Sequence, residues 1–364
     1  MKTFLSNLIS QYFEYFEYFE TYDIFPWSDL SSDEVSVKKD VLIIICRDHF
    51  MHPSLFNNNN YNYAVSDTVR HVHNIAKTNS TKKVLFVTEN IDSHREFSQL
   101  STLNNLYIIS THNFLAVEYN DYLHLTPHTK KIKSSTTFLC LTGKPRPHRV
   151  QTTYYLIYKN LFNLGIITFL SGGYSQLDFD PNVVNTWAMP THLKLNRFNK
   201  KLYKLNDYKK FGIRSEDYTT GPLNNSSNFN QLRDYYEKSY IEIITNPTCI
   251  EPSHSLDEKY INSVFGYVFP IFIATNGFVQ SIRDLGFDVF DDIVDHSYDN
   301  EPNPYYRIKY AIDLNNKLLR DREFLEEKFA ECIPRFEANV KHYKENLKRI
   351  LESRVQQQLD AITF

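Results

Sequence analysis

The sequence predicts an α/β protein of two lobes with a cleft between them and helices at its C-terminus. The chain has 364 residues, more than the roughly 250–300 at which a single hydrophobic core stops growing. Short apolar runs alternate with helical segments, which is the pattern of a parallel sheet, and this pattern restarts near residue 136. We therefore expect one lobe over residues 1–135, a second over 136–320, and a helical tail over 321–364.

Strands make up most of the first lobe's expected elements. Residues 12–20 form an aromatic and acidic three-residue repeat, and we expect a short helix laid over the body of the lobe there. The apolar, β-branched runs DVLIIIC, KVLFV and LYIIS predict core strands. They occupy residues 40–46, 83–87 and 106–110, and a helix is expected at 64–77.

The second lobe repeats the alternation of strands and helices. Residues 175–230 are rich in Asn, Asp and Lys and predict loops with short helices. The tail alternates charges at helical spacing, with an interruption at Pro334, so we expect one or two long packing helices. Strands are expected at residues 137–141, 166–170, 240–245 and 270–274, and helices at 150–164 and 258–266.

Composition and charge favour a folded, soluble protein. Hydrophobic residues make up 42% of the chain and charged residues 23%, and the formal net charge is −3. A duplex-binding protein is usually strongly basic, whereas the sequence pI here is about 6.5. No apolar stretch approaches the ~18 residues of a membrane span, and the N-terminus has no small-residue cleavage signal, so we expect neither a span nor a signal peptide.

The cysteine pattern predicts a reducing compartment. Cys46, Cys140, Cys249 and Cys332 are far apart and form no C-x-x-C pair, so neither a zinc site nor a disulfide framework is expected. Asp178-Phe179-Asp180 is formally a metal-binding triplet, but its neighbour Pro181 favours a turn. We therefore expect a cytoplasmic protein.

Polar residues follow several of the expected strands, where the ligands of parallel sheets gather. Glu89 follows the strand at 83–87, and Asn246 follows the strand at 240–245. Burial at a strand end raises the pKa of a carboxylate, as a general base requires, although Glu89 can equally be a surface or capping acid. Rivals for the base by the same logic are Asp48, His49 and His112.

A helix start between two expected strands carries paired charges. Glu258 and Lys259 open the helix at 258–266, and Asn262 follows one turn later. A Glu can bind ribose hydroxyls through two acceptor oxygens, while a Lys beside a helix N-terminus offers charge to a diphosphate. Both residues can equally be ordinary first-turn helix charges.

A basic turn, GKPRPHR, joins strand to helix at residues 143–149. Its cations stand in front of a helix N-terminus and can cradle a diphosphate. Arg149 is the first choice for that contact. The alternative is a solvated basic turn.

These segments resemble the donor-site signature of fucosyltransferase-like glycosyltransferases, in particular phage and bacterial members. Residues 255–271 resemble a run in which Thr-Glu-Lys opens a helix, an Asn follows and a Gly-x-Val-Pro-like turn leads into a strand. Residues 285–307, with Asp-His-Ser-Tyr-Asp and a later Arg, resemble its continuation. The turn at 143–149 resembles its basic turn, and Thr88-Glu89-Asn90 its Thr-Gly-Glu-Asn segment.

The resemblance implies the glycosyltransferase B (GT-B) fold, with two Rossmann-like lobes, and a metal-independent, inverting transfer of a sugar from a GDP- or UDP-linked donor. Arg149 and Lys259 would neutralise the leaving diphosphate. Glu258 and Asn262 would hold the nucleotide, Asn246 would contact the donor, and Glu89 in the acceptor-side first lobe would be the base. The donor is a substrate, so no separate cofactor is expected, and the acceptor stays open between glycan, protein and nucleic acid.

Two other functions fit the sequence. Departures from the signature are Asp257 in place of Thr, His296 in place of Glu, and the missing Gly before Glu89, and they favour a non-catalytic binding or virion-associated protein. A glycosyltransferase acting on DNA bases shares the first mechanism but needs a basic groove. Its candidate lysines are Lys130, Lys131 and Lys133, or Lys200, Lys201, Lys209 and Lys210.

Overall fold

Two compact units make up the chain in the computed structural model. One comprises Met1–Asn120, Pro252–Leu256 and Glu345–Phe364, and the other Asp121–Glu251 and Asp257–Lys344. Each unit contains a parallel sheet and helices, which confirms the predicted α/β class. The predicted lobe boundaries near residues 135 and 320 stay predictions. The structure describes residues 19–24, 41–46, 74–88, 103–110, 122–132, 136–142, 147–169, 229–230, 232–246, 249, 254, 256 and 258–361.

The sheet of the first unit has parallel strands in sequence order, β1-β2-β3-β4. Three of them confirm the strands predicted from apolar runs, and the side chains of Val84, Leu85 and Phe86 are buried. Residues 74–78 are helical, within the predicted helix at 64–77, whose other residues up to 73 lie outside the described part. The strands span Phe19–Ile24, Val41–Cys46, Lys83–Thr88 and Leu106–Ser110.

The helix predicted over residues 12–20 is wrong at its last two residues. Phe19 and Glu20 begin β1, which pairs in parallel with β2 from Phe19 opposite Val41 onward. Aromatic and β-branched residues favour strands, and an aromatic-rich repeat fits a pleated surface as well as a helix. Residues 12–18 lie outside the described part of the chain.

Strand β4 lies at one edge of this sheet and is closed by helix α15, Lys348–Asp360. The amide nitrogen of Gln358 donates to Ser110 O at 2.9 Å, and Ser110 N donates to Gln358 Oε1 at 2.8 Å. These two bonds satisfy the N–H and the C=O of Ser110, as a neighbouring strand would. They thereby block pairing of another strand at the end of β4.

The sheet of the second unit has the strand order β6-β5-β7-β8, with all strands parallel. Every residue of β5, β7 and β8 is buried, as expected for a parallel sheet covered on both faces. The strands span Phe138–Thr142 (β5), Gly165–Phe169 (β6), Ile241–Thr245 (β7) and Phe269–Ile273 (β8), each within one residue of its predicted bounds.

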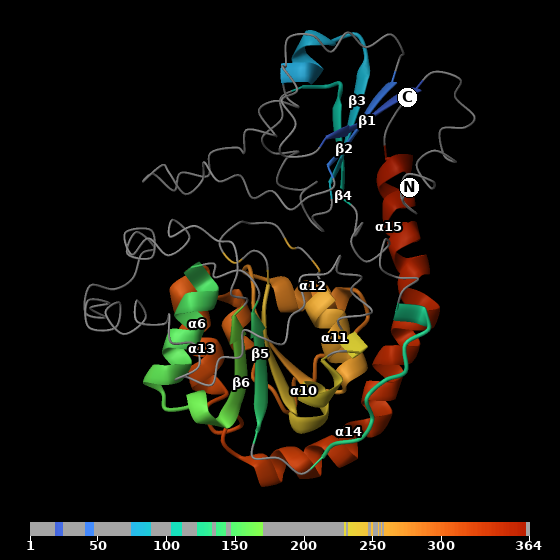
Figure 1. Ribbon diagram of the computed structural model, residues 1–364. Helices are drawn as coiled ribbons and strands as arrows, with labels where there is room; N and C mark the ends of the chain where they lie inside the picture. Colours follow the sequence, from blue (N-terminus) through green and yellow to red (C-terminus); the bar gives the residue numbers. More distant parts are fainter. Residues whose placement is uncertain are drawn as a thin grey trace. The chain divides into compact units, whose positions relative to one another are not determined.

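Helices cover both faces of this sheet, as Figure 1 shows. Helices α6 (Pro147–Tyr158) and α13 (Pro304–Leu314) pack together on one face. Helices α10 (Arg233–Lys238) and α11 (Glu258–Gly266) lie on the other. The bounds of α11 agree with the predicted helix.

Helix α6 begins and ends earlier than the predicted 150–164. Pro147 suits a first helical position because its fixed φ is helical and its missing N–H has no partner there anyway. At the other end Asn160 takes a φ of 54°, and Leu161 N donates to Leu156 O at 2.9 Å. This left-handed turn ends a helix, and a short 3₁₀ turn at Phe162–Leu164 leads into β6.

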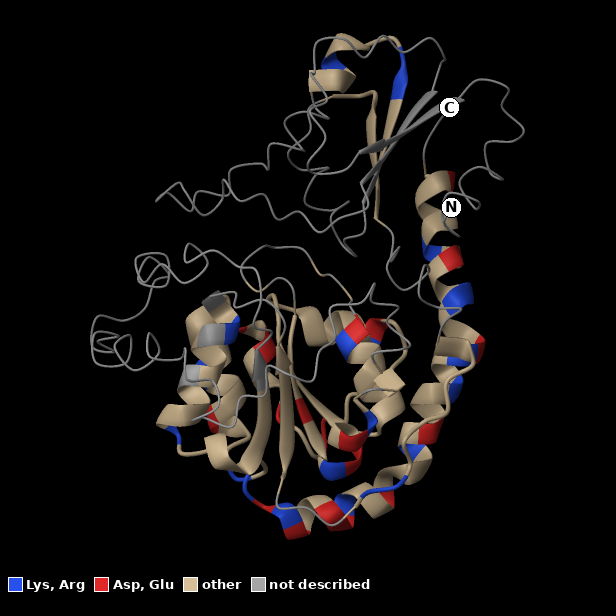
Figure 2. Cartoon of the chain, viewed as in Figure 1, with Lys and Arg blue, Asp and Glu red and all other residues tan. Residues whose placement is uncertain are grey.

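The C-terminal tail is helical almost throughout. Helix α14 (Arg322–His342) packs on α11 and runs through Pro334, where the sequence predicted an interruption. The buried side chains of Phe329, Cys332 and Phe336 hold this helix in place around the proline. The helix changes instead at a π turn, Tyr343–Leu347, which leads into α15. Charges of both signs spread along α14 and α15, as expected of solvated packing helices (Figure 2).

Strand β8 lies at the edge of the sheet, and side chains bind its outward-facing backbone groups. Phe269 N donates to Tyr240 O and Ile273 O accepts from Asn246 N, so the alternate residues Pro270 and Phe272 face outward. Pro270 has no N–H to satisfy there. Its carbonyl lies 3.0 Å from His296 Nε2, and Phe272 N donates to the Tyr298 hydroxyl at 2.9 Å.

This closure predicts the effect of Tyr298→Phe. The substitution keeps the buried ring but leaves the Phe272 N–H without an acceptor, which costs about 1–3 kcal/mol of the free energy of unfolding. Chemical denaturation measures the loss. The matched control is Tyr310→Phe on the surface of α13, where the residue is 38% exposed, and an equal loss in both variants would contradict this account of the edge.

Candidate functional site

The strand order of the second unit reverses at β5. From β5 the chain passes through α6 to β6 on one side, and then returns to β7 on the other side of β5. Helix α6 follows β5 and covers one face, whereas α11 follows β7 and covers the opposite face (Figure 1). Ligands of open α/β sheets bind at such a switch point, outside the carboxyl ends of the strands. The candidate site is therefore the carboxyl edge between β5 and β7.

The first turn of α6 is joined to the carboxyl end of β7. His148 Nε2 lies 2.7 Å from Asn246 O, and Arg149 Nη2 donates to Thr245 O at 3.1 Å. Both side chains are buried, and each residue is only 3% exposed. The buried Arg149 side chain thus ties α6 to the end of β7, and its positive charge lies at the edge where a ligand of the switch point would bind.

The first turn of α11 carries an ion pair at the same edge. Lys259 Nζ lies 2.7 Å from Glu258 Oε1, with the two side chains 14% and 28% exposed. Burial opposes ionisation of Glu258, but the Lys259 ammonium and, more weakly, the Arg149 guanidinium hold its pKa below the ordinary value. Two cations from two helix N-termini therefore flank one ionised carboxylate.

The predicted site residues do not all gather there. Arg149, Asn246, Glu258 and Lys259 lie at the switch point. Asn262 faces away from it, because its side chain is buried and its Oδ1 accepts from the Tyr122 hydroxyl at 2.7 Å. Glu89 lies outside the described residues. His148 was missed, although it stands in the basic turn that the sequence singles out.

Much of the 285–307 segment serves the structure. The Asp299 carboxylate accepts from Val279 N and Gln280 N at 3.1 and 3.2 Å, in the first turn of α12 (Phe278–Asp284). Arg307 is 2% exposed and donates to the carbonyls of Ala274, Glu301 and Cys249. These bonds fix the backbone just after β8 and β7, at the rim of the candidate site.

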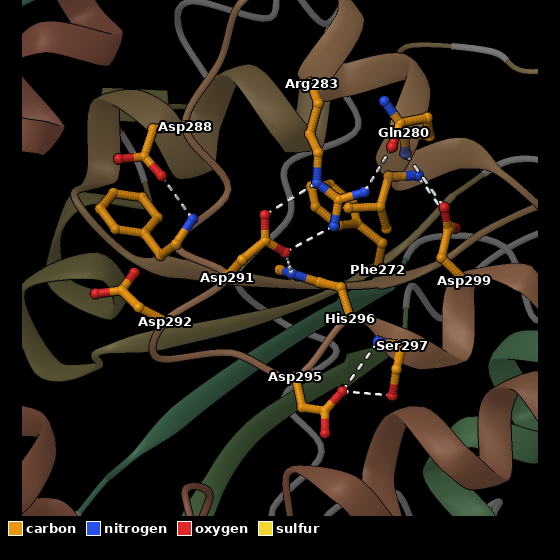
Figure 3. A network of polar contacts seen from close by, with 12 residues as sticks. Phe272, Gln280, Arg283, Asp288, Asp291, Asp292, Asp295, His296, Ser297 and Asp299 are labelled. Atoms are coloured by element: carbon orange, nitrogen blue, oxygen red, sulfur yellow. Dashed lines mark hydrogen bonds and ion pairs between the residues drawn. The ribbon is translucent and has the colours of Figure 1, made fainter.

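A cavity of about 470 Å³ lies elsewhere, beside α12 and the short helix Ser297–Asn300. Its polar side chains bind one another, as Figure 3 shows. Arg283 donates to both carboxylate oxygens of Asp291, which lowers the pKa of that carboxyl, and His296 Nδ1 lies 3.0 Å from the same group. Because these groups hold the loop against β8, we take the switch point and not this cavity as the candidate site.

Lys131, a candidate for a basic groove, binds backbone carbonyls within the second unit. Its ammonium donates to Tyr236 O at 2.9 Å and to Gly266 O at 3.1 Å, and burial lowers its pKa well below the ordinary value. Among the candidate lysines, Lys133 and those between 200 and 210 lie outside the described residues.

The described residues offer neither a metal site nor a membrane span. They contain no group of three or more His, Cys, Asp and Glu side chains arranged to hold a metal ion. No helix among them is both long and apolar enough to cross a membrane. Known proteins add no assignment, because no family model matches the chain and no curated protein matches its sequence.

The Glu258 environment predicts a pH dependence. A carboxyl whose pKa is lowered by folding contributes stability above its unfolded pKa, and this contribution is lost as the pH falls through the folded value. The difference in free energy of unfolding between wild type and Glu258→Gln should therefore be largest near pH 7. It should shrink below about pH 4.5, measured by urea denaturation across pH.

The control for this series is Glu323→Gln, which removes the same charge from an exposed position on α14. A wild-type to Glu258→Gln difference that stays constant from pH 7 to pH 3 would contradict the ion pair.

Proposed function

We propose that this protein is a GT-B glycosyltransferase that transfers a sugar from a nucleotide-sugar donor to an acceptor without a metal ion. The observation that carries the proposal is the convergence of Arg149, Glu258 and Lys259 at the switch point of the second unit. The resemblance in sequence names the same residues, and the strand order, which is independent of it, selects the same edge.

The charges suit a leaving diphosphate. The N-termini of α6 and α11 both open at this edge, and helix N-termini attract anions through their unpaired N–H groups and dipoles. Lys259 adds the positive charge of a side chain that is 14% exposed, and the buried Arg149 adds a second positive charge. As the bond to the sugar breaks, negative charge grows on the diphosphate, and these preorganised cations stabilise it most at that stage.

Glu258 has a second task in this mechanism. Its carboxylate keeps Lys259 oriented before the donor binds, and its second oxygen can accept from a ribose hydroxyl. The transfer also needs a base to take the acceptor's proton, and we assign this role to Glu89. Direct attack by the acceptor on the face opposite the diphosphate inverts the configuration at the sugar.

The structure gives one argument for a non-catalytic protein. The charges of Glu258 and Lys259 already satisfy each other at 2.7 Å, as in an ordinary helix cap. Of the lysines named for a DNA-modifying enzyme, only Lys130 and Lys131 lie among the described residues, and the Lys131 ammonium binds two carbonyls of its own unit.

Nucleotide binding tests the proposal. GDP, UDP, ADP and CMP are each added to wild type and to Lys259→Ala, and the melting temperature is measured. One nucleoside diphosphate should stabilise the wild type by about 2.7 kcal/mol at a concentration 100-fold above Kd. In Lys259→Ala the affinity should fall about tenfold or more, because a charge-assisted bond is lost.

The matched control is Lys317→Ala, which removes an exposed lysine from the same unit and should bind like the wild type. If no nucleotide stabilises the wild type, the protein is a non-catalytic member of the fold and the proposal is wrong.

A further inference from the structure

Three buried polar side chains at the carboxyl edge make no hydrogen bond with any residue that the structure describes. They are the hydroxyls of Thr245 and Thr275 and both amide atoms of Gln151. Thr245 is fully buried, and the other two residues are 2–3% exposed. Buried polar groups are nearly always paired, because leaving one unpaired costs free energy, so each such group requires an explanation.

The backbone places these groups near one another. Thr245 ends β7 and pairs in register with Ile273, the last residue of β8, so Thr275 follows only two residues beyond that pair. The Glu242 carboxylate accepts from the Tyr236 hydroxyl, so Glu242 lies on the face of the sheet that α10 covers. Side chains alternate along a strand, so Thr245 points to the opposite face, which α6 covers.

Gln151 belongs to the same place. It lies three residues after His148, on one face of α6, and His148 reaches Asn246 O at the edge. Long side chains on a helix tilt toward its N-terminus, so the Gln151 amide lies level with the first turn of α6. The three side chains therefore border the α6 side of the candidate site, whereas Glu258 and Lys259 border the α11 side.

The chemistry of the two sides differs. The α11 side carries charge and suits phosphates and a ribose diol. The α6 side offers two hydroxyls and one amide, which both donate and accept but carry no charge. Such a set matches a neutral polyhydroxylated ring, whose hydroxyls also donate and accept.

We propose that Gln151, Thr245 and Thr275 form the subsite for the sugar of the donor. The identity of the ligand in this inference rests on the proposed function. The predicted change in melting temperature of the ligand-free protein does not. The subsite costs stability while it is empty, and the sugar hydroxyls supply the missing partners. These side chains therefore determine which sugar the protein accepts.

The first test concerns the protein without ligand. Thr275→Val and Thr245→Val keep the side-chain shape and remove an unpaired hydroxyl, so each should raise the melting temperature, by about 2–4 °C. Thr152→Val is the matched control, because the Thr152 hydroxyl is equally buried but donates to His148 O at 2.8 Å. It should not raise the melting temperature.

The second test concerns the ligand. Isothermal titration compares the nucleoside diphosphate that stabilises the wild type with its nucleotide sugars, such as GDP with GDP-fucose and GDP-mannose, or UDP with UDP-glucose. In wild type the preferred nucleotide sugar should bind more tightly than the diphosphate. Thr275→Val should reduce that preference about three- to tenfold and leave diphosphate affinity unchanged, and Gln151→Met should act in the same direction.

Three results would overturn the inference. If Thr275→Val and Thr245→Val lower the melting temperature as Thr152→Val does, another part of this chain pairs with the hydroxyls. If the variants weaken diphosphate and nucleotide sugar equally, the groups do not face the sugar. If they weaken only a free oligosaccharide, the subsite takes the acceptor. Failure of the wild type to bind any nucleotide would refute the proposed function, whereas the stability test would still stand.

Discussion

The reversal of strand order at β5 is the constraint on which the candidate site depends. Because β6 and β7 lie on opposite sides of β5, the helices that follow β5 and β7 leave to opposite faces. Their N-termini then open at one edge with no helix crossing between them. Every charge that we assign to ligand binding lies in the first turn of one of these helices. The described strands of the first unit's sheet lie in sequence order and include no such reversal.

The contacts around that edge divide into two kinds. Buried groups fix the backbone, as when Arg307 binds one carbonyl after β7, one after β8 and that of Glu301, and His148 contacts Asn246 O. Partly exposed groups, Glu258 and Lys259, are available to a ligand. Arg149 belongs to both kinds, since it binds Thr245 O and its charge also reaches Glu258. A rigid rim and a charge pair already held in place are what preorganised electrostatic stabilisation requires.

The sequence predicted the strands well because parallel strands buried on both faces are unbroken apolar runs. It failed where local patterns were ambiguous, at Phe19 and Glu20 in β1 and at Pro334 inside α14. For the site, the charged residues were visible as a pattern at a helix start. Asn262 was assigned to the ligand because sequence spacing does not show that it meets Tyr122, which lies 140 positions away. Thr245, Thr275 and Gln151 carry no motif and become notable only once their burial is known.

Hydrogen exchange with and without the stabilising nucleoside diphosphate tests the central claim most directly. Mass spectrometry reads the exchange of peptides covering the first turns of α6 and α11, and of peptides covering residues 288–300 beside the cavity. Slower exchange confined to the two helix starts is the predicted result, because a bound diphosphate accepts hydrogen bonds from N–H groups of the first helical turn. Protection of residues 288–300, with the helix starts unchanged, would place the ligand in the cavity and contradict the account.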